Sequence, residues 1–375
     1  MSSQPAQPVR SNTPRLRTDL DLIPSYKAGQ RPAPREDIVV YKASSNENPY
    51  PPLPGVLEAI ADSAASMQRY PDPFSTRLVT ALATRFDVST DSIGLGTGSV
   101  ALCGQVIQAA THPGDEVVYA WRSFESYPIW TRMAHAVSVQ VPLRSDESHD
   151  IEAMAAAVTD RTRVMFCCTP NNPTGPAVTG TELAWLLDNV PSDVVVVVDE
   201  AYREFVTDPQ VPDGIEFGRG RSNVVVLRTF SKAYGLAGLR VGFAVADPLV
   251  IDAMRKFAIP FGVSNVAEDA ALASLEREDE LFARVQALAV ERERVWQALV
   301  DQGWPLHATQ ANFIWFRLGE LSVPFMQACE SAGITVRPFP GEGVRVSIVE
   351  TESNDRLLQV AQKFLQSHVH LASQE

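Results

Sequence analysis

The sequence lacks long hydrophobic runs and an N-terminal targeting pattern. No stretch of it approaches the roughly 18 apolar residues that a membrane-spanning helix requires. The segment from Met1 to Arg17 is polar, contains Pro and Ser, and has no apolar core of the kind found in secretory signal peptides. We therefore predict a cytoplasmic protein that does not bind membranes, with a flexible N-terminal segment over residues 1–24.

Basic residues are also scarce. Lys and Arg together number 32 against 45 Asp and Glu, so the formal net charge is −13. Because nucleic acids need a basic binding face, we expect no nucleic-acid partner. An anionic small molecule would have to be held by a few well-placed arginines or by backbone amides. The few lysines of the chain are Lys27, Lys42, Lys232, Lys256 and Lys363.

Cysteine is equally rare, and the four cysteines do not show the spacing of metal ligands. Cys167 and Cys168 lie inside an apolar run, which favours buried free thiols in a reducing cytosol. We accordingly expect no metal site.

A length of 375 residues favours one large domain and a smaller one. The N-terminal part is rich in Pro and is interrupted by Asn46-Glu47-Asn48-Pro49, which predicts an extended arm over residues 25–74 that packs with the small domain. Alternating helical and strand-like segments predict a large domain over residues 75–262. A small α+β domain over residues 263–375 is predicted from a helix-rich stretch at 265–302 and strands at 312–317 and 343–348.

Three segments of the large domain have the composition of buried strands. They cover residues 163–169, 193–199 and 223–229, and the second contains five consecutive valines. Apolar runs without alternation are typical of parallel strands that are covered by helices on both faces. A helical stretch at 181–189 is long enough to connect two of them. The middle of the chain is therefore predicted to be α/β with a mainly parallel sheet.

Polar residues follow each of these strands. They are Thr169-Pro170-Asn171-Asn172-Pro173-Thr174-Gly175, Asp199-Glu200-Ala201-Tyr202 and Ser231-Lys232 with Arg240 nearby. Taken singly, each group has an ordinary explanation as a turn, a helix cap or a solvated surface pair. Ligands of open parallel sheets, however, bind beyond the carboxyl ends of the strands. Since all three groups would meet at that edge, we favour a shared binding site.

The residue types at this edge suit pyridoxal 5′-phosphate (PLP). The amine of Lys232 could form an imine if the protein keeps it partly deprotonated. Asp199, at the end of a buried strand, could keep the pyridine nitrogen of the cofactor protonated. Asn172 and Tyr202 could then donate hydrogen bonds to the phenolic oxygen of the ring.

A glycine-rich turn supplies a candidate phosphate site. Gly94, Gly96 and Gly98 precede an apolar helical stretch, and backbone amides at the start of such a helix bind phosphate. Ser231 and Arg240 could add a hydroxyl group and a bidentate guanidinium. The glycines do not follow the G-x-G-x-x-G spacing of dinucleotide sites, so a cofactor with one phosphate fits better.

Together these motifs resemble the fold-type I PLP-dependent enzymes, and more narrowly the branch of histidinol-phosphate and aromatic amino-acid aminotransferases. The resemblance runs from about Tyr26 to Arg345. It rests on Ser45-Asn46-Glu47-Asn48-Pro49, Tyr70-Pro71-Asp72, Asn172-Pro173-Thr174-Gly175, Asp199-Glu200-Ala201-Tyr202 and Ser231-Lys232-x-x-Gly-x-x-Gly-x-Arg240. It implies an α/β fold with a mainly parallel central sheet covered by helices, a smaller α+β domain, and PLP-dependent aminotransferase activity.

The resemblance also implies roles for individual residues. Lys232 would be the Schiff-base lysine and proton shuttle, with Asp199 at the pyridine nitrogen and Tyr202 at the phenolic oxygen. Tyr70 would reach the cofactor phosphate of the neighbouring subunit, which implies a homodimer. Arg345 would bind the α-carboxylate of the substrate. Further cofactor contacts would come from Gly98, Ser99, Val100, Phe124, Asn172, Ser231 and Arg240.

Two departures from the histidinol-phosphate pattern concern the amino donor. Val100-Ala101 stands where those enzymes usually carry an acidic pair, and Phe124 replaces the commoner Tyr. Gly-Ser-Val-x-Leu-Cys and Trp-Arg-Ser-Phe-Glu are closer to the actinobacterial aromatic amino-acid aminotransferases. We therefore predict ping-pong transfer of the amino group from Phe, Tyr or Trp to 2-oxoglutarate. Candidate substrate contacts besides the carboxylate-binding arginine are Tyr26, Asn48, Tyr127 and Arg337.

Other functions stay open on the sequence alone. Arg337 could bind the phosphate of histidinol phosphate, or it could form an ordinary surface ion pair. A PLP-dependent decarboxylase of the same branch would release carbon dioxide instead of a 2-oxo acid. An NAD-dependent dehydrogenase would explain the glycine-rich turn but not Lys232 together with Asp199. A non-catalytic binding module would have no use for the lysine.

Overall fold

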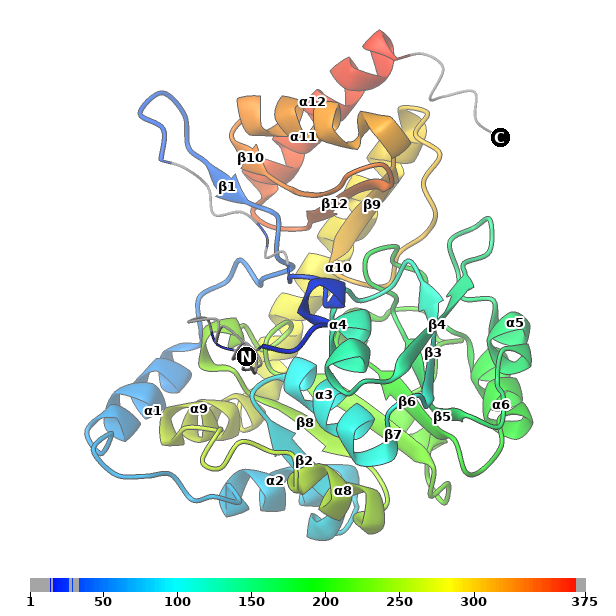
Figure 1. Cartoon of the computed structure of the whole chain (residues 1–375). Coiled ribbons are helices and arrows are strands. Elements are labelled where there is room, and N and C mark those ends of the chain that lie inside the picture. Colours follow the sequence, from blue (N-terminus) through cyan, green and yellow to red (C-terminus); the bar gives the residue numbers. More distant parts are fainter. Residues whose placement is uncertain (1–13, 15, 27–28, 30–33, 369–375) are drawn as a thin grey trace, which may run out of the picture.

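The computed structural model describes residues 14, 16–26, 29 and 34–368. The flexible segment predicted over residues 1–24 falls largely outside the described residues. Figure 1 shows a larger lower part built around a sheet and a smaller upper part, and the long helix α10 (Glu278–Asp301) runs between them.

The larger part contains, within the described residues, a seven-stranded sheet. Across the sheet its strands are β2 (Ile93–Gly96), β8 (Gly242–Val245), β7 (Val224–Thr229), β6 (Val195–Asp199), β5 (Thr162–Cys168), β3 (Glu116–Trp121) and β4 (Val137–Pro142). β7, β6, β5, β3 and β4 pair in parallel, and β8 is antiparallel to both of its neighbours. The mainly parallel sheet is confirmed, and so are the three predicted buried strands, which are β5, β6 and β7.

The five consecutive valines explain why β6 lies at the centre of this sheet. Val196 and Val198 belong to one buried cluster, whereas Val197 belongs to the cluster on the opposite face. Successive side chains of a strand point to opposite faces, so an uninterrupted apolar run fills both cores. The helices of this part of the chain are α1 (Pro54–Ala64), α2 (Thr76–Phe86), α3 (Ser99–Ala110), α4 (Ser126–Met133), α5 (Ile151–Ala156), α6 (Gly180–Asn189), α7 (Gly214–Phe217), α8 (Pro248–Arg255) and α9 (Asn265–Leu275).

The smaller part is an antiparallel sheet in the order β11-β12-β9, with helices beside it (Figure 1). In chain order its elements are β9 (Phe313–Arg317), α11 (Ser322–Ser331), β10 (Ile334–Thr335), β11 (Arg337–Phe339), β12 (Gly343–Ser347) and α12 (Thr351–Ser367). The N-terminal arm contributes β1 (Tyr41–Lys42), which pairs in parallel with β10. Helix α9, which the sequence analysis assigned to the small domain, lies against α1 and α2. The domain limits at residues 74 and 262 stay predictions.

Two smaller features bear on the sequence predictions. Among the described residues, no helix is both long enough and apolar enough to cross a membrane. All four cysteines are free and buried.

His149 makes the stability of the fold depend on pH. The ring is 3% exposed, and burial lowers its pKa to about 4, against about 6.5 in an unfolded chain. The stability contributed by the neutral ring is therefore complete above about pH 6.5 and is lost as the pH falls toward 4.

We expect the free energy of unfolding to fall, between pH 7 and pH 5, by about 2 kcal/mol more in the wild type than in His149→Gln. Urea unfolding at the two pH values measures both losses. The Gln variant carries the other titrating groups unchanged, so equal losses in the two proteins would contradict the assignment.

Candidate active site

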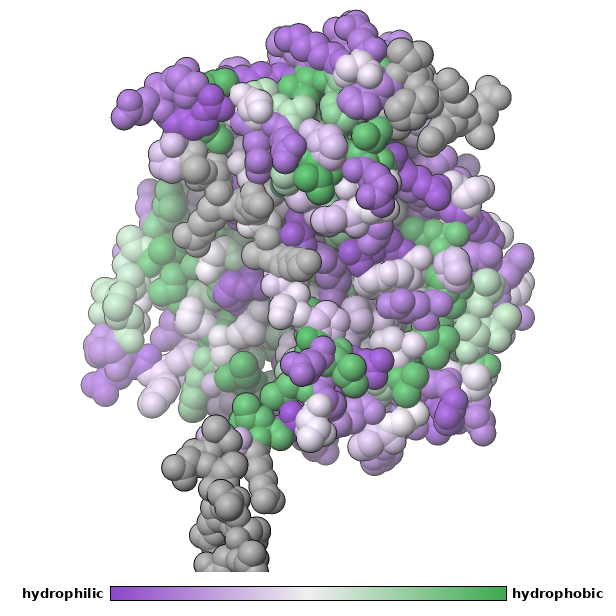
Figure 2. All heavy atoms as spheres, turned by 45° about the horizontal axis from the view of Figure 1, so that its top comes forward, coloured by the Kyte–Doolittle hydropathy of each residue, from purple (hydrophilic) through white to green (hydrophobic). Residues whose placement is uncertain are grey.

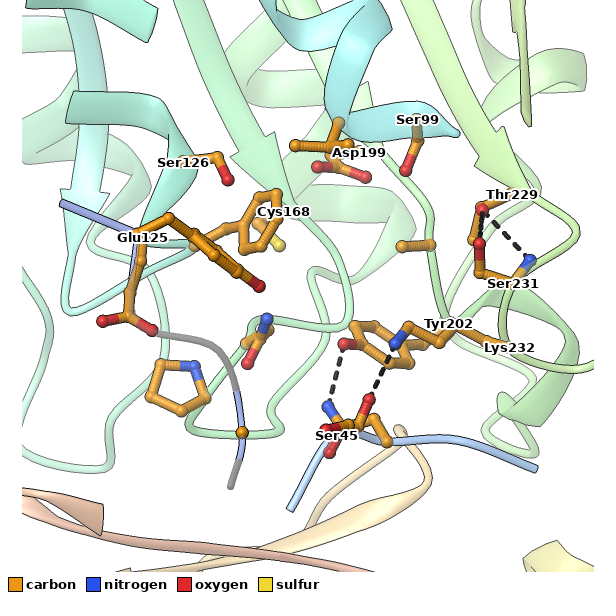
Figure 3. Close-up of a pocket in the computed structure, with 18 of the residues that line it drawn as sticks. Ser45, Ser99, Glu125, Ser126, Cys168, Asp199, Tyr202, Thr229, Ser231 and Lys232 are labelled. Carbon is orange, nitrogen blue, oxygen red and sulfur yellow. Dashed lines mark hydrogen bonds between the residues drawn. The ribbon is translucent and has the colours of Figure 1, made fainter. Parts of the chain in front are cut away.

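The carboxyl ends of β5, β6 and β7 open onto a cavity of about 590 Å³ that residues of both parts of the molecule line (Figure 3). Most of the predicted site residues meet there. Those that line it are Tyr26, Ser99, Val100, Phe124, Asn172, Asp199, Tyr202, Ser231, Lys232, Arg240, Arg337 and Arg345.

Lys232 follows β7 and points into this cavity. Its Nζ donates a hydrogen bond to the carbonyl oxygen of Ser45 at 3.0 Å and lies 5.9 Å from the ring centroid of Tyr202. Burial lowers the pKa of this amine to about 7, and the positive charge of Arg345 contributes to the lowering. A large fraction of the amine is therefore unprotonated at neutral pH, as a nucleophile or proton acceptor requires.

Asp199 ends β6 on another wall of the cavity. It is 3% exposed, and its Oδ2 accepts a hydrogen bond from the hydroxyl of Tyr127 at 2.7 Å. Its Oδ1 has no hydrogen-bond partner among the described residues. Burial raises the pKa of the carboxyl group to about 6. A buried acceptor without a partner is costly, and a protonated ring nitrogen is a donor that would satisfy it.

The part of the cavity wall at the start of α3 suits an anion. Helix α3 begins there after Gly98, whose φ is +82°, and a Cβ at Gly98 would lie 2.5 Å from Nη2 of Arg240. Nη1 of Arg240 donates to Oγ of Ser231 at 3.3 Å, and the hydroxyls of Ser231 and Thr229 lie 3.0 Å apart. Helix amides, a guanidinium and two hydroxyls suit one phosphate group. The residues present therefore fit PLP at both ends.

Arg345 connects the two parts of the molecule at the cavity. It is 8% exposed, its Nη1 donates to Oδ1 of Asn172, and its Nη2 donates to the carbonyl oxygen of Ser44 at 3.0 Å. Nδ2 of Asn46 donates to the hydroxyl oxygen of Tyr202 at 2.9 Å, which leaves the hydroxyl hydrogen of Tyr202 available to another acceptor. The two acceptors of Arg345 are uncharged, and a buried guanidinium with such partners attracts a carboxylate.

Two predicted substrate contacts need correction, because their side chains do not line the cavity. Tyr127 is completely buried, stacks on Phe166 at a centroid distance of 4.3 Å, and supports Asp199 from behind. Asn48 donates to the carbonyl oxygen of Ala233 at 2.8 Å and accepts from the amide of Tyr50 at 3.0 Å. Neither side chain is placed to contact a substrate in the cavity.

Tyr70 lies elsewhere. Its side chain is 82% exposed and stacks on Phe261 at 4.8 Å, and it is not part of the cavity of its own chain.

The sequence analysis missed several residues of the cavity wall. Ser45 and Asn46 belong to a motif already noted, and Glu125 and Phe339 are sequence neighbours of predicted contacts. Thr229 ends a predicted strand. Their closeness in sequence to the motifs could have pointed to these residues. It does not show in which direction each side chain points.

The pKa of Lys232 can be tested by labelling the ligand-free protein with trace acetic anhydride across a range of pH. We expect half-maximal labelling of Lys232 near pH 7, and a higher midpoint in Arg345→Met, which lacks the neighbouring positive charge. Mass spectrometry of the Lys232 peptide measures both midpoints, with the exposed Lys256 as the internal reference. Labelling of Lys232 only above about pH 9 would contradict the lowered pKa of its amine.

Comparison with known proteins identifies the family of the chain. Residues 39–360 match the sequence model of the family described as aminotransferase class I and II. The aromatic amino acid aminotransferase of Streptomyces avermitilis is 58% identical over 356 residues, which are 95% of this chain and 99% of that protein. The enzyme of the same name from Thermobifida fusca is 57% identical over 351 residues, covering 94% of this chain and 97% of its own.

A solved structure shares the fold. The histidinol-phosphate aminotransferase of Sinorhizobium meliloti, in complex with pyridoxal-5′-phosphate, is 28% identical with a TM-score of 0.80, over 88% of this chain and 92% of that one. The chain therefore belongs to the class I and II aminotransferases and is a PLP-dependent transaminase of fold-type I.

Proposed function

We propose that this transaminase moves the amino group of an aromatic L-amino acid (Phe, Tyr or Trp) to 2-oxoglutarate by a ping-pong mechanism. The observation that carries the transfer chemistry is one cavity that combines the low-pKa amine of Lys232, the half-paired carboxylate of Asp199 and the buried Arg345. The aromatic donor is supported by the names of relatives that are 57–58% identical over nearly the whole chain.

When bound, PLP supplies an aldehyde that combines with amino groups and a ring that takes up the negative charge developing on the substrate α-carbon. Oδ1 of Asp199 would hold the proton on the pyridine nitrogen. Asn172 and Tyr202 would donate to the phenolic oxygen, since Oδ1 of Asn172 is engaged by Arg345 and its amide hydrogens are free to turn inward. The aromatic ring of Phe124 would stack on the cofactor. The phosphate would be held by Gly98, Ser99, Val100, Ser231 and Arg240.

Two residues would act directly on the substrate. Arg345 would bind the α-carboxylate, which fixes the orientation of the α-carbon. Nζ of Lys232 would accept the α-proton and give it up again later in the turnover. A pKa near 7 suits both directions of this transfer, because the amine and the ammonium are then both populated at neutral pH.

The competing donor is histidinol phosphate. Arg337 lies in the cavity wall, where a guanidinium could bind a phosphate. A single-turnover comparison of L-phenylalanine and histidinol phosphate on the PLP-loaded protein separates the two. We expect the visible absorbance of the bound cofactor to be lost rapidly with phenylalanine and slowly with histidinol phosphate. Lys232→Ala, as the blank, should lose more than roughly 10²-fold in rate because it lacks the proton acceptor. Preference for histidinol phosphate would overturn the proposed donor.

We also propose a homodimer in which Tyr70 reaches the cofactor of the partner. Tyr70 and Met67 are 82% and 73% exposed and border one surface hollow with Phe261. On the nearby helix α1, Leu57 is 49% exposed. Figure 2 shows apolar side chains gathered on the left of the view over α1, whereas the upper region over α11 and α12 is mainly hydrophilic. Exposed apolar clusters of this kind are typical of subunit interfaces.

Mixing two inactive variants tests this contribution of Tyr70. In a dimer of Lys232→Ala with Tyr70→Ala, one site would carry both defects and the other would be intact. After subunit exchange at equal amounts, we expect about a quarter of wild-type activity, since half the dimers are mixed and each has one intact site of two. Activity no higher than the average of the separate variants would show that Tyr70 does not act across the interface.

A further inference from the structure

An ion pair crosses the cavity at the end away from Lys232. Nη2 of Arg337, on β11, lies 2.8 Å from Oε2 of Glu125, the residue that directly precedes α4 in the other part of the molecule. The side chains are 9% and 24% exposed, so solvent screens the pair only in part. Figure 3 shows Glu125 and Lys232 on opposite sides of the cavity.

The position of Arg337 explains why a carboxylate is needed there. Arg337 is directly opposite Arg345 in the antiparallel pair of β11 and β12, so both guanidinium groups leave the same face of the sheet. Like charges in this arrangement repel, and the pKa of Arg345 is lowered by burial and further by the charge of Arg337. Glu125 compensates Arg337, whereas the groups that accept hydrogen bonds from Arg345, the side-chain amide of Asn172 and the carbonyl of Ser44, are uncharged.

The pair is part of a neutral cluster. Arg122 lies 3.8 Å from Glu125 and 3.1 Å from Glu342, so two guanidinium groups and two carboxylates balance. Both arginines also lie over the ring of Phe339, at 4.9 Å and 5.1 Å.

The walls around this cluster are apolar. Ile129, Trp130 and Met133 project from α4 into the cavity lining, and Phe339 faces it from β11. An aromatic ring would meet aliphatic and aromatic surface here without bringing any charge.

We propose that Glu125 sets the choice of amino donor: by neutralising Arg337, it presents an uncharged surface to the ring of the donor and leaves Arg345 alone to bind the anionic group of the donor, which suits a carboxylate and disfavours a phosphate. This inference rests on the proposed function and names its specificity residue. A phosphate monoester carries a charge of about −1.5 to −2 at neutral pH. To reach Arg337 it would have to displace Glu125 and leave that carboxylate partly buried beside it. The distal carboxylate of 2-oxoglutarate adds only one negative charge, so its penalty is smaller.

Glu125→Gln removes the charge and keeps the size, and Glu342→Gln is the matched control. Glu342 also belongs to the cluster, but its side chain is 42% exposed, it pairs with Arg122 and it does not line the cavity. We expect Glu125→Gln to raise the ratio of kcat/KM for histidinol phosphate to kcat/KM for phenylalanine by about 10-fold or more, through a lower KM for histidinol phosphate. The same ratio in Glu342→Gln should stay within about 3-fold of the wild type.

A binding measurement gives a second readout that needs no turnover. By calorimetry on the PLP-loaded protein, Glu125→Gln should bind glutarate about 3- to 10-fold more tightly and 3-phenylpropionate unchanged. An unchanged ratio and unchanged glutarate affinity would overturn the proposal. So would an equal rise in KM for both donors, since that indicates a structural role. If the wild type does not convert phenylalanine, the proposed function fails, and the glutarate measurement still decides whether Glu125 governs anion binding.

Discussion

The chemistry of the cavity depends on one carboxylate buried at the end of the central sheet. Asp199 is the last residue of β6, and its neighbours on both sides are buried strand residues of β5 and β7. Tyr127 occupies one carboxylate oxygen, and the other lacks a partner among the described residues. Leaving a buried acceptor unpaired costs on the order of 1–3 kcal/mol. A protonated ring nitrogen of the cofactor would relieve this cost, and cofactor binding would then be linked to the ionisation of Asp199.

The second constraint is the concentration of positive charge around Lys232. Burial and Arg345 both lower the pKa of its amine. A substrate carboxylate bound to Arg345 would offset one of these two causes, and the amine would become a stronger base when the substrate is in place. In the proposed role, Arg345 would in this way both bind the substrate and adjust the proton acceptor. The same logic explains why Arg345 has neutral partners: a carboxylate in the position of Asn172 would remove the effect.

The sequence predicted the parts of this site that depend on backbone periodicity. Five valines followed by Asp199 placed a carboxylate at the end of a central strand, and the structure has β6 there. Prediction failed where side-chain direction decided the outcome. Tyr127 comes three residues after Phe124, but α4 begins at Ser126 and turns Tyr127 toward the sheet. Asn48 was likewise engaged by local partners.

Contacts between the two parts of the molecule were also out of reach. The bond from Arg345 joins it to a residue 173 positions away, and that from Arg337 spans 212 positions. No periodicity links such residues, because their approach depends on how the β9-β12-β11 sheet is placed over the large sheet. The family resemblance supplied Arg345. It could not supply Glu125, whose relevance follows only from its position opposite Arg337.

The two arginines of the small sheet differ in function because their hydrogen-bond partners differ, although the residue type is the same. They are cross-strand neighbours, and both line the same cavity. Arg345 donates to an amide and a carbonyl oxygen, so its charge is uncompensated by these partners and attracts a carboxylate. Arg337 donates to a carboxylate and lies over an aromatic ring, so a ligand meets a neutral, flat surface at that point. Two guanidinium groups on adjacent strands thus form one region that suits a charged end of a substrate and another that suits an uncharged end. An α-amino acid with an aromatic side chain matches this arrangement with a single carboxylate at its charged end, whereas histidinol phosphate carries a phosphate with a charge of about −1.5 to −2 in place of the carboxylate.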